Sequence, residues 1–142
     1  MNNLLGLAIA IAAEGFKDRF DKAGEPYMLH CIRIMMKMET VAEKILAILH
    51  DCVEDGVTTI ELLRNMEFPE DILDDLKLLT HNKGEDYLDV YIVKIAMSPR
   101  ATKVKKEDLH DNSDITRLKG LAKADVDRMY KYHKAYTYLK NI

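Results

Sequence analysis

The stretch from Ile45 to Asp55 constrains this chain more than any other part of the sequence. At about 100° per residue, its apolar residues gather on one side of a helix. The other side carries His50, Asp51, Glu54 and Asp55. Three carboxylates this close repel one another, and over an apolar helix they are partly desolvated, so a cation must compensate them. The pattern predicts a helix from Val41 to about Asp55 with a divalent metal beside His50.

The residue types around His50 indicate which metals fit. Histidine nitrogens mixed with carboxylate oxygens suit Mn²⁺, Fe²⁺ or Zn²⁺ better than Ca²⁺, which prefers oxygen alone. His50 and Asp51 are neighbours, and both can reach one ion that lies beyond the helix face. The remaining ligands must come from other segments. His30 and Asp108 are the candidates, because each lies beside apolar residues that turn it inward.

Each of these residues also has a simpler interpretation. His30 on an apolar helix can be a hydrogen-bonded core histidine, and Asp108 lies in a charged run that by itself indicates a solvated helix face. Glu54 and Asp55 can be surface acids at the end of a helix, although the helix dipole disfavours acids at a C-terminus. A purely structural helical protein is therefore an alternative, and it predicts no thermal shift with Mn²⁺.

Helical patterns cover nearly all of the chain, so we predict an all-α fold. Its 142 residues suit one compact domain, residues 1–142, with a sizeable core. Seven or eight helices are expected, and no segment alternates like a β-strand. Thr40 and Glu43 form an expected capping box. The predicted helices cover residues 4–13, 27–38, 41–55, 59–66, 70–81, 87–96, 101–112 and 124–139.

Charge and hydropathy exclude several kinds of partner. The net charge of −3 provides no overall basic field for nucleic acid, and no apolar run reaches the length of a membrane span. The first residues lack the features of a signal peptide, so a cytoplasmic protein is expected. Cys31 and Cys52 lie in apolar helical patterns and are expected to be free, buried thiols. A small-molecule partner is expected, and the sequence indicates no particular oligomeric state.

Several motifs, taken in chain order, resemble a known family. The segment Lys22–Tyr27 is followed by His30, then by Leu49–Asp55, then by Leu79, Thr80 and His81, and finally by Val104, Lys105, Asp108 and Asn112. This series resembles the HD-domain metal-dependent phosphohydrolases. In this order it is similar to the hydrolase domain of the RelA/SpoT alarmone enzymes and to the small stand-alone alarmone hydrolases. The resemblance covers roughly residues 8–139 and implies an HD-domain helical bundle.

The resemblance also implies roles for individual residues. It implies that one metal ion, Mn²⁺ in most of this family with other divalent ions as alternatives, is held by His30, His50, Asp51 and Asp108. Glu54 and Asp55 match the pair that positions and activates the attacking water. Lys22 matches a basic residue near the phosphates. Independently of the resemblance, the charge of Lys105 or Arg128 is expected to help Lys22 neutralise the leaving group. Asn112 matches an asparagine on the nucleotide side of the pocket.

Four positions depart from the family pattern. Phe16 replaces a common histidine, Cys31 replaces the proline after the ligand histidine, and Glu107 replaces a small residue. Asp21 replaces the first residue of a basic pair, which leaves Lys22 alone. None of these changes removes a metal ligand. The lost cation at Asp21 weakens the case for a substrate with two pyrophosphate groups.

The function implied by the resemblance is removal of the 3′-pyrophosphate of guanosine 3′,5′-bis(diphosphate), ppGpp, to give GDP and pyrophosphate. Two alternatives stay open. The chain can be an HD phosphohydrolase for another nucleotide, or a nucleotide-binding module that has lost catalysis.

Overall fold

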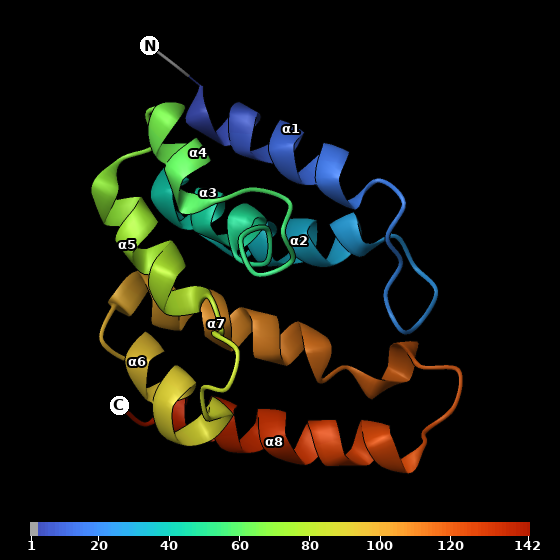
Figure 1. Ribbon diagram of the computed structural model, residues 1–142. Coiled ribbons are helices and arrows are strands. Elements are labelled where there is room, and N and C mark those ends of the chain that lie inside the picture. The colour runs from blue at the N-terminus through green and yellow to red at the C-terminus, as the bar shows by residue number, and fades with distance from the viewer. Residues whose placement is uncertain (1–2) are drawn as a thin grey trace.

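The computed structural model describes residues 3–142, which form eight α-helices, one π-helix and one 3₁₀ helix (Figure 1). The α-helices are α1 (Leu4–Phe16), α2 (Tyr27–Met36), α3 (Val41–Leu49), α4 (Ile60–Asn65), α5 (Glu70–Leu79), α6 (Val93–Ile95), α7 (Pro99–Asn112) and α8 (Lys123–Lys140). The π-helix η1 covers Tyr87–Ile92, and the 3₁₀ helix η2 covers Ile115–Arg117. These residues contain no β-strand, only an isolated antiparallel bridge between Phe20 and Pro26. The predicted all-α fold is confirmed.

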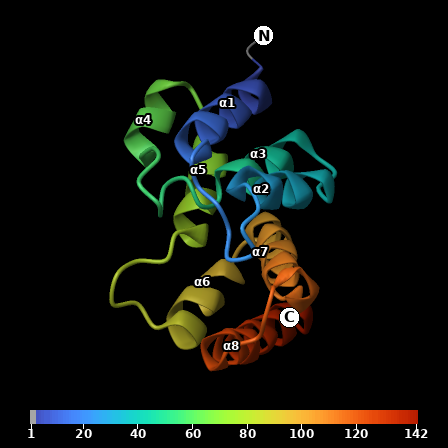
Figure 2. The ribbon, with the colours of Figure 1, turned by 90° about the vertical axis from the view of Figure 1, so that its right-hand side faces the viewer.

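The helices pack in successive layers. In Figure 2, α1 lies above α2 and α3, and α7 and α8 lie below them. Helix α3 contacts α1, α2, α5 and α7, so it occupies the centre of the molecule. Within the described residues, no helix combines the length and the apolar composition that a membrane crossing requires.

Helix α3 is central because its second half is apolar on every side. The five consecutive residues Ile45–Leu49 are all buried, so neighbours must cover the whole circumference of the helix. Its start is set by the predicted capping box, in which the Thr40 hydroxyl accepts a hydrogen bond from the Glu43 N–H and the Glu43 carboxylate accepts one from the Thr40 N–H. Cys52, just beyond α3, is also buried and free, as predicted.

Truncation of Leu46 tests whether α3 carries the core. Leu46 is 0% exposed, so Leu46→Ala should lower the free energy of unfolding by about 2–5 kcal/mol through lost apolar burial and a cavity. Urea denaturation measures the loss. The control is Leu62→Ala on α4, where the side chain is 49% exposed and the expected loss is below about 1 kcal/mol. Equal losses for the two variants would contradict the central role of α3.

The prediction that the central helix continues to Asp55 is wrong beyond Leu49. Residues 50–56 form consecutive turns instead. The Cys52 N–H donates to the Leu49 carbonyl, an i to i+3 bond that tightens the chain, and Gly56 ends the segment with φ +76°. The acidic residues therefore project from a turn at the end of α3 rather than from the face of a regular helix.

Helices α1, α2, α4, α5 and α8 differ from their predicted bounds by at most three residues, and two other segments differ in kind or at a cap. The segment predicted as a helix over residues 87–96 is the π-helix η1 followed by the short α6. Helix α7 begins at Pro99 rather than Ala101, because the Ser98 hydroxyl caps it and proline fits the first helical position, where no N–H is needed.

Candidate metal centre

The four predicted metal ligands come together at one point. His30 projects from α2, His50 and Asp51 follow α3, and Asp108 projects from α7. One donor atom of each lies within 4.8 Å of the others. Asp108 Oδ1 is 3.0 Å from His30 Nε2 and 3.3 Å from His50 Nε2, and Asp51 Oδ2 is 3.1 Å from His50 Nε2. Because side chains from three segments converge, a divalent metal can bind here.

Both histidines present Nε2 to the cluster because Nδ1 is engaged elsewhere. His50 Nδ1 lies 2.6 Å from the Ala47 carbonyl oxygen, so it donates a hydrogen bond there. His30 Nδ1 lies 2.6 Å from Asp111 Oδ2 and donates to that carboxylate. An Nδ1–H held in this way leaves the lone pair on Nε2 and fixes the ring orientation, which is typical of histidines that bind metals.

An unpartnered buried nitrogen in the cluster is the test of whether a metal fits. His30 Nε2 is buried and makes no hydrogen bond among the described residues, although Asp108 Oδ1 is 3.0 Å away. Two imidazole lone pairs and two carboxylates at one point need a cation. Burial alone would lower the pKa of His50, but the charges of Asp51 and Asp108 raise it well above its ordinary value. This donor set suits a first-row divalent ion.

The two carboxylates are ionised when the cluster is intact. Burial would raise the pKa of Asp51, but His50 lowers it to about 2. Burial would also raise the pKa of Asp108, and Lys105 and His50 hold it well below its ordinary value. The side chain of Asp51 is 18% exposed, against 3% for each histidine, so the cluster meets solvent on the Asp51 side.

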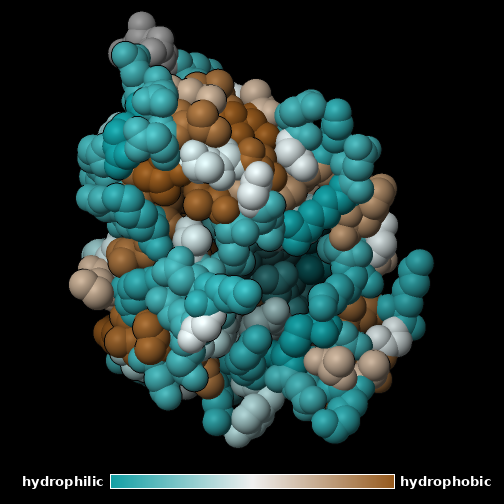
Figure 3. Space-filling view, viewed as in Figure 1, coloured by the Kyte–Doolittle hydropathy of each residue, from teal (hydrophilic) through white to brown (hydrophobic). Residues whose placement is uncertain are grey.

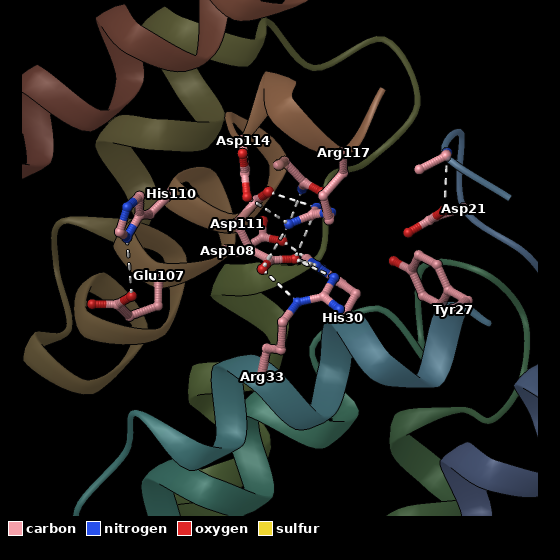
Figure 4. Close-up of polar contacts among 12 residues, drawn as sticks. Asp21, Tyr27, His30, Arg33, Glu107, Asp108, His110, Asp111, Asp114 and Arg117 are labelled. Atoms are coloured by element: carbon pink, nitrogen blue, oxygen red, sulfur yellow. Dashed lines mark hydrogen bonds and ion pairs between the residues drawn. The ribbon is translucent and has the colours of Figure 1, made fainter. Parts of the chain in front are cut away.

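Asp111 holds His30 at Nδ1, on the side of the ring away from the cluster, and the sequence analysis did not predict this contact. Figure 4 shows its carboxylate between His30, Arg33 and Arg117. Arg33 donates from Nε at 2.7 Å and from Nη2 at 3.0 Å, and Arg117 Nη2 donates to the Asp111 carbonyl at 2.8 Å. The available signal was spacing, because Asp111 lies three residues after Asp108 and Arg33 three after His30 on their helices.

Loss of the Asp111 carboxylate should weaken the metal site without removing a ligand. In Asp111→Ala, His30 Nδ1 loses its acceptor, and the affinity for Mn²⁺ should fall roughly 10–100-fold. Titration of Mn²⁺ followed by electron paramagnetic resonance measures the change. Asp114→Asn is the matched control, since Asp114 pairs with Arg117 at 3.5 Å and makes no contact with His30. Unchanged affinity in Asp111→Ala would contradict this supporting role.

A stack of side chains before and within α2 supports Asp51. The Tyr27 hydroxyl donates a hydrogen bond to Asp51 Oδ2. Phe16 packs edge-on against the Tyr27 ring with centroids 4.9 Å apart, and the Arg19 guanidinium lies 4.0 Å from the centroid of that ring. Phe16, a departure from the family pattern, is thus a packing partner of Tyr27. Nothing in the sequence distinguished Arg19 from other polar residues of this segment.

The two predicted water-activating acids have different partners. Asp55 forms an ion pair with Arg19. Glu54 Oε1 accepts a hydrogen bond from the His81 N–H at 2.7 Å, and its Oε2 accepts none among residues 3–142. Although the Glu54 side chain is exposed overall, desolvation of its carboxyl group and the nearby charge of Asp51 raise its pKa against the effect of the His81 N–H. A carboxylate of raised pKa with one free oxygen can accept a proton.

A cavity of about 290 Å³ adjoins the cluster, and His30 and Tyr27 form part of its wall. Figure 1 places the loop before α2 and the segment after α7 at the same end of the molecule, and residues of both line the cavity. On the face in Figure 3, hydrophilic side chains surround a hollow near the middle of the molecule. The polar lining residues include Arg19, Asp21, Lys22, Asn112, Asp114, Arg117 and Arg128.

Of the two charged side chains in this loop, Arg19 rather than Asp21 supplies positive charge at the cavity wall. Asp21 Oδ1 accepts hydrogen bonds from the N–H groups of Ala23 and Glu25, both at 2.9 Å, so its charge is turned into its own loop. Arg19 and Asp21 flank Phe20, which bridges to Pro26, and in extended backbone residues two apart face the same side. Both line the cavity.

Of the predicted substrate-contacting residues, Lys22 and Asn112 line this cavity, and Asn112 Nδ2 also donates to Asp108 Oδ1 at 3.1 Å. Arg128, its predicted helper, lines it as well. Lys105 does not. Its ammonium lies 2.8 Å from Asp108 Oδ2, because on α7 residues three apart share a face. The position of Lys105 therefore favours contact with a metal ligand rather than with substrate.

Comparison with known proteins supports the fold. No protein-family model matches the sequence, and no curated protein is detectably similar to it. Among the solved structures that match is one described as a metazoan ortholog of SpoT that hydrolyzes ppGpp and plays a role in starvation responses. It aligns over 98% of this chain and 86% of its own, with 20% identity and a TM-score of 0.79. The resemblance inferred from the motifs is confirmed as a shared fold, and the chain carries a cluster of two histidines and two aspartates that could hold a metal ion.

Proposed function

We propose that this protein is a metal-dependent phosphohydrolase that removes the 3′-pyrophosphate of ppGpp, giving GDP and pyrophosphate, with Mn²⁺ as the metal. The observation that carries the proposal is the convergence of His30, His50, Asp51 and Asp108 beside a cavity that contains four basic side chains. The shared fold with a ppGpp-hydrolyzing protein supports this substrate.

Each part of the site has a role in the proposed reaction. A bound divalent ion supplies Lewis-acid polarisation of the phosphate and makes water more acidic. Glu54, held at Oε1 by the His81 N–H, takes the proton of the attacking water at Oε2. Asp55, fixed by Arg19, orients that water. Lys22 and Arg128 neutralise phosphate charge from the cavity wall, and Asn112 contacts the nucleotide.

Product analysis tests the proposed function directly. The purified protein is freed of metal with a chelator, reloaded with Mn²⁺ and incubated with ppGpp, and the nucleotides are separated by anion exchange. Equimolar GDP and pyrophosphate are expected. Release of orthophosphate alone, or no product with Mn²⁺, Fe²⁺ or Zn²⁺, would contradict the proposal.

A nucleotide with fewer phosphate groups is the second candidate substrate. It is favoured by the acids near the cavity, since Asp114 lines it and Arg128 is paired with Asp125. A panel of nucleoside mono-, di- and triphosphates, assayed for both phosphate and pyrophosphate, separates the two candidates. A catalytic efficiency for any of these above that for ppGpp would favour the second.

A further inference from the structure

Lys105 is a buried cation next to the candidate metal centre, on the side of Asp108 away from the two histidines. The residue is 8% exposed, and Asp108 is 4% exposed. Lys105 Nζ lies 2.8 Å from Asp108 Oδ2, whereas Asp108 Oδ1 faces both histidines. The two oxygens of one carboxylate are thus divided between the ammonium group and the cluster.

The surroundings of Lys105 hold the ammonium group in this place. Its Nζ lies 5.1 Å from the centroid of the Tyr91 ring and 5.8 Å from that of the Tyr87 ring. Among residues 3–142, Asp108 is the one carboxylate that forms an ion pair with it. Aromatic faces favour a cation but cannot neutralise it, so the charge of Lys105 is directed at Asp108. Lys105 is absent from the cavity wall.

The charges around the cluster do not cancel when a divalent ion is present. Asp51 and Asp108 together carry two negative charges, which would balance a divalent ion by themselves. Lys105 adds a further positive charge at the opposite side of Asp108. In a site of low polarity, two positive charges on opposite sides of one carboxylate repel each other strongly. An ammonium group in this position opposes metal binding and leaves the loaded centre positive toward an anion.

We propose that Lys105 is a positioning residue that restricts Asp108 to one coordinating oxygen and lowers the affinity of the centre for its divalent ion. The inference rests on the metal site of the proposed function, but not on the identity of the nucleotide. If Lys105 had a merely structural role, its loss would loosen Asp108 and weaken metal binding. That change in metal affinity is opposite to the one that the proposal requires.

The affinity for Mn²⁺ distinguishes these roles. Lys105→Met removes the charge and keeps an apolar chain of similar length among the tyrosine rings. We expect it to bind Mn²⁺ roughly tenfold more tightly or more, measured by calorimetry with the metal alone. Lys105→Arg, which keeps the charge, should stay within about threefold of the wild type. Lys106→Met, one position along α7, is the matched control and should leave the affinity unchanged.

Weaker or unchanged Mn²⁺ binding in Lys105→Met, with normal binding in the control, would overturn the inference. If Lys105→Met does not fold without metal, Lys105→Gln removes the same charge while keeping a hydrogen-bond donor, and the same increase in affinity is required of it. A wild type that binds Mn²⁺ without hydrolysing ppGpp would end the proposed function and leave this test valid. Absence of Mn²⁺ binding in the wild type would overturn both.

Discussion

Asp51→Asn is expected to abolish Mn²⁺ binding and turnover together. Asp51 supplies one of the two negative charges that face the histidines, with Oδ2 3.1 Å from His50 Nε2. At an effective dielectric constant of about 20, one pair of unit charges about 4 Å apart contributes about 4 kcal/mol, which corresponds to roughly a thousandfold in affinity. The Tyr27 hydroxyl can still donate to the amide oxygen, so the fold should persist.

Thermal unfolding with and without Mn²⁺ gives the measurement. The wild type should be stabilised by excess Mn²⁺, by about 2.7 kcal/mol at a hundred times the dissociation constant, and Asp51→Asn should show no shift. Asp89→Asn is the control, because Asp89 is an exposed acid on η1 outside the cluster. A variant that retains both the Mn²⁺-induced shift and pyrophosphate release would refute the proposed centre.

Glu54→Gln should separate catalysis from metal binding. The amide oxygen can still accept the hydrogen bond of the His81 N–H, so the side chain should keep its place. The proton acceptor is lost, however, and kcat for pyrophosphate release should fall roughly 10²–10⁴-fold with little change in Mn²⁺ affinity. Glu61→Gln on α4, where the acid pairs with Arg64 at 2.7 Å, is the control.

The pH profile gives a second measurement for Glu54. Desolvation of its carboxyl group raises its pKa, and a base acts only when deprotonated. Wild-type activity should therefore be present above that pKa and lost as the pH falls through it. The loss should begin at a higher pH than for an ordinary glutamate. In Glu54→Gln this limb of the profile should disappear. A variant with nearly full kcat and the wild-type profile would show that another group accepts the proton.

The order of helices and four of the key side chains could be predicted from the sequence. Apolar spacing marks which face of each helix is buried, and this property is local, so the all-α fold follows from it. The His50–Asp51 doublet, with His30 and Asp108 as the inward-facing candidates for the other ligands, identified the side chains that the structure brings within 4.8 Å of one another. The end of α3 could not be predicted, because helical spacing continues through residues that the structure places in turns.

The supporting contacts were decided by tertiary structure alone. Periodicity states that a side chain faces inward, but it does not state which side chain of another helix it meets. Asp111 contacts His30 across 81 positions of the chain, and Arg19 reaches Asp55 across 36. Lys105 was predicted to contact substrate from its charge, yet the packing of α7 against α2 and the end of α3 places it behind Asp108. The sequence by itself indicated which residues meet at the candidate metal centre, because their types and spacing are local properties. The packing of the helices decided which other side chains hold them in place.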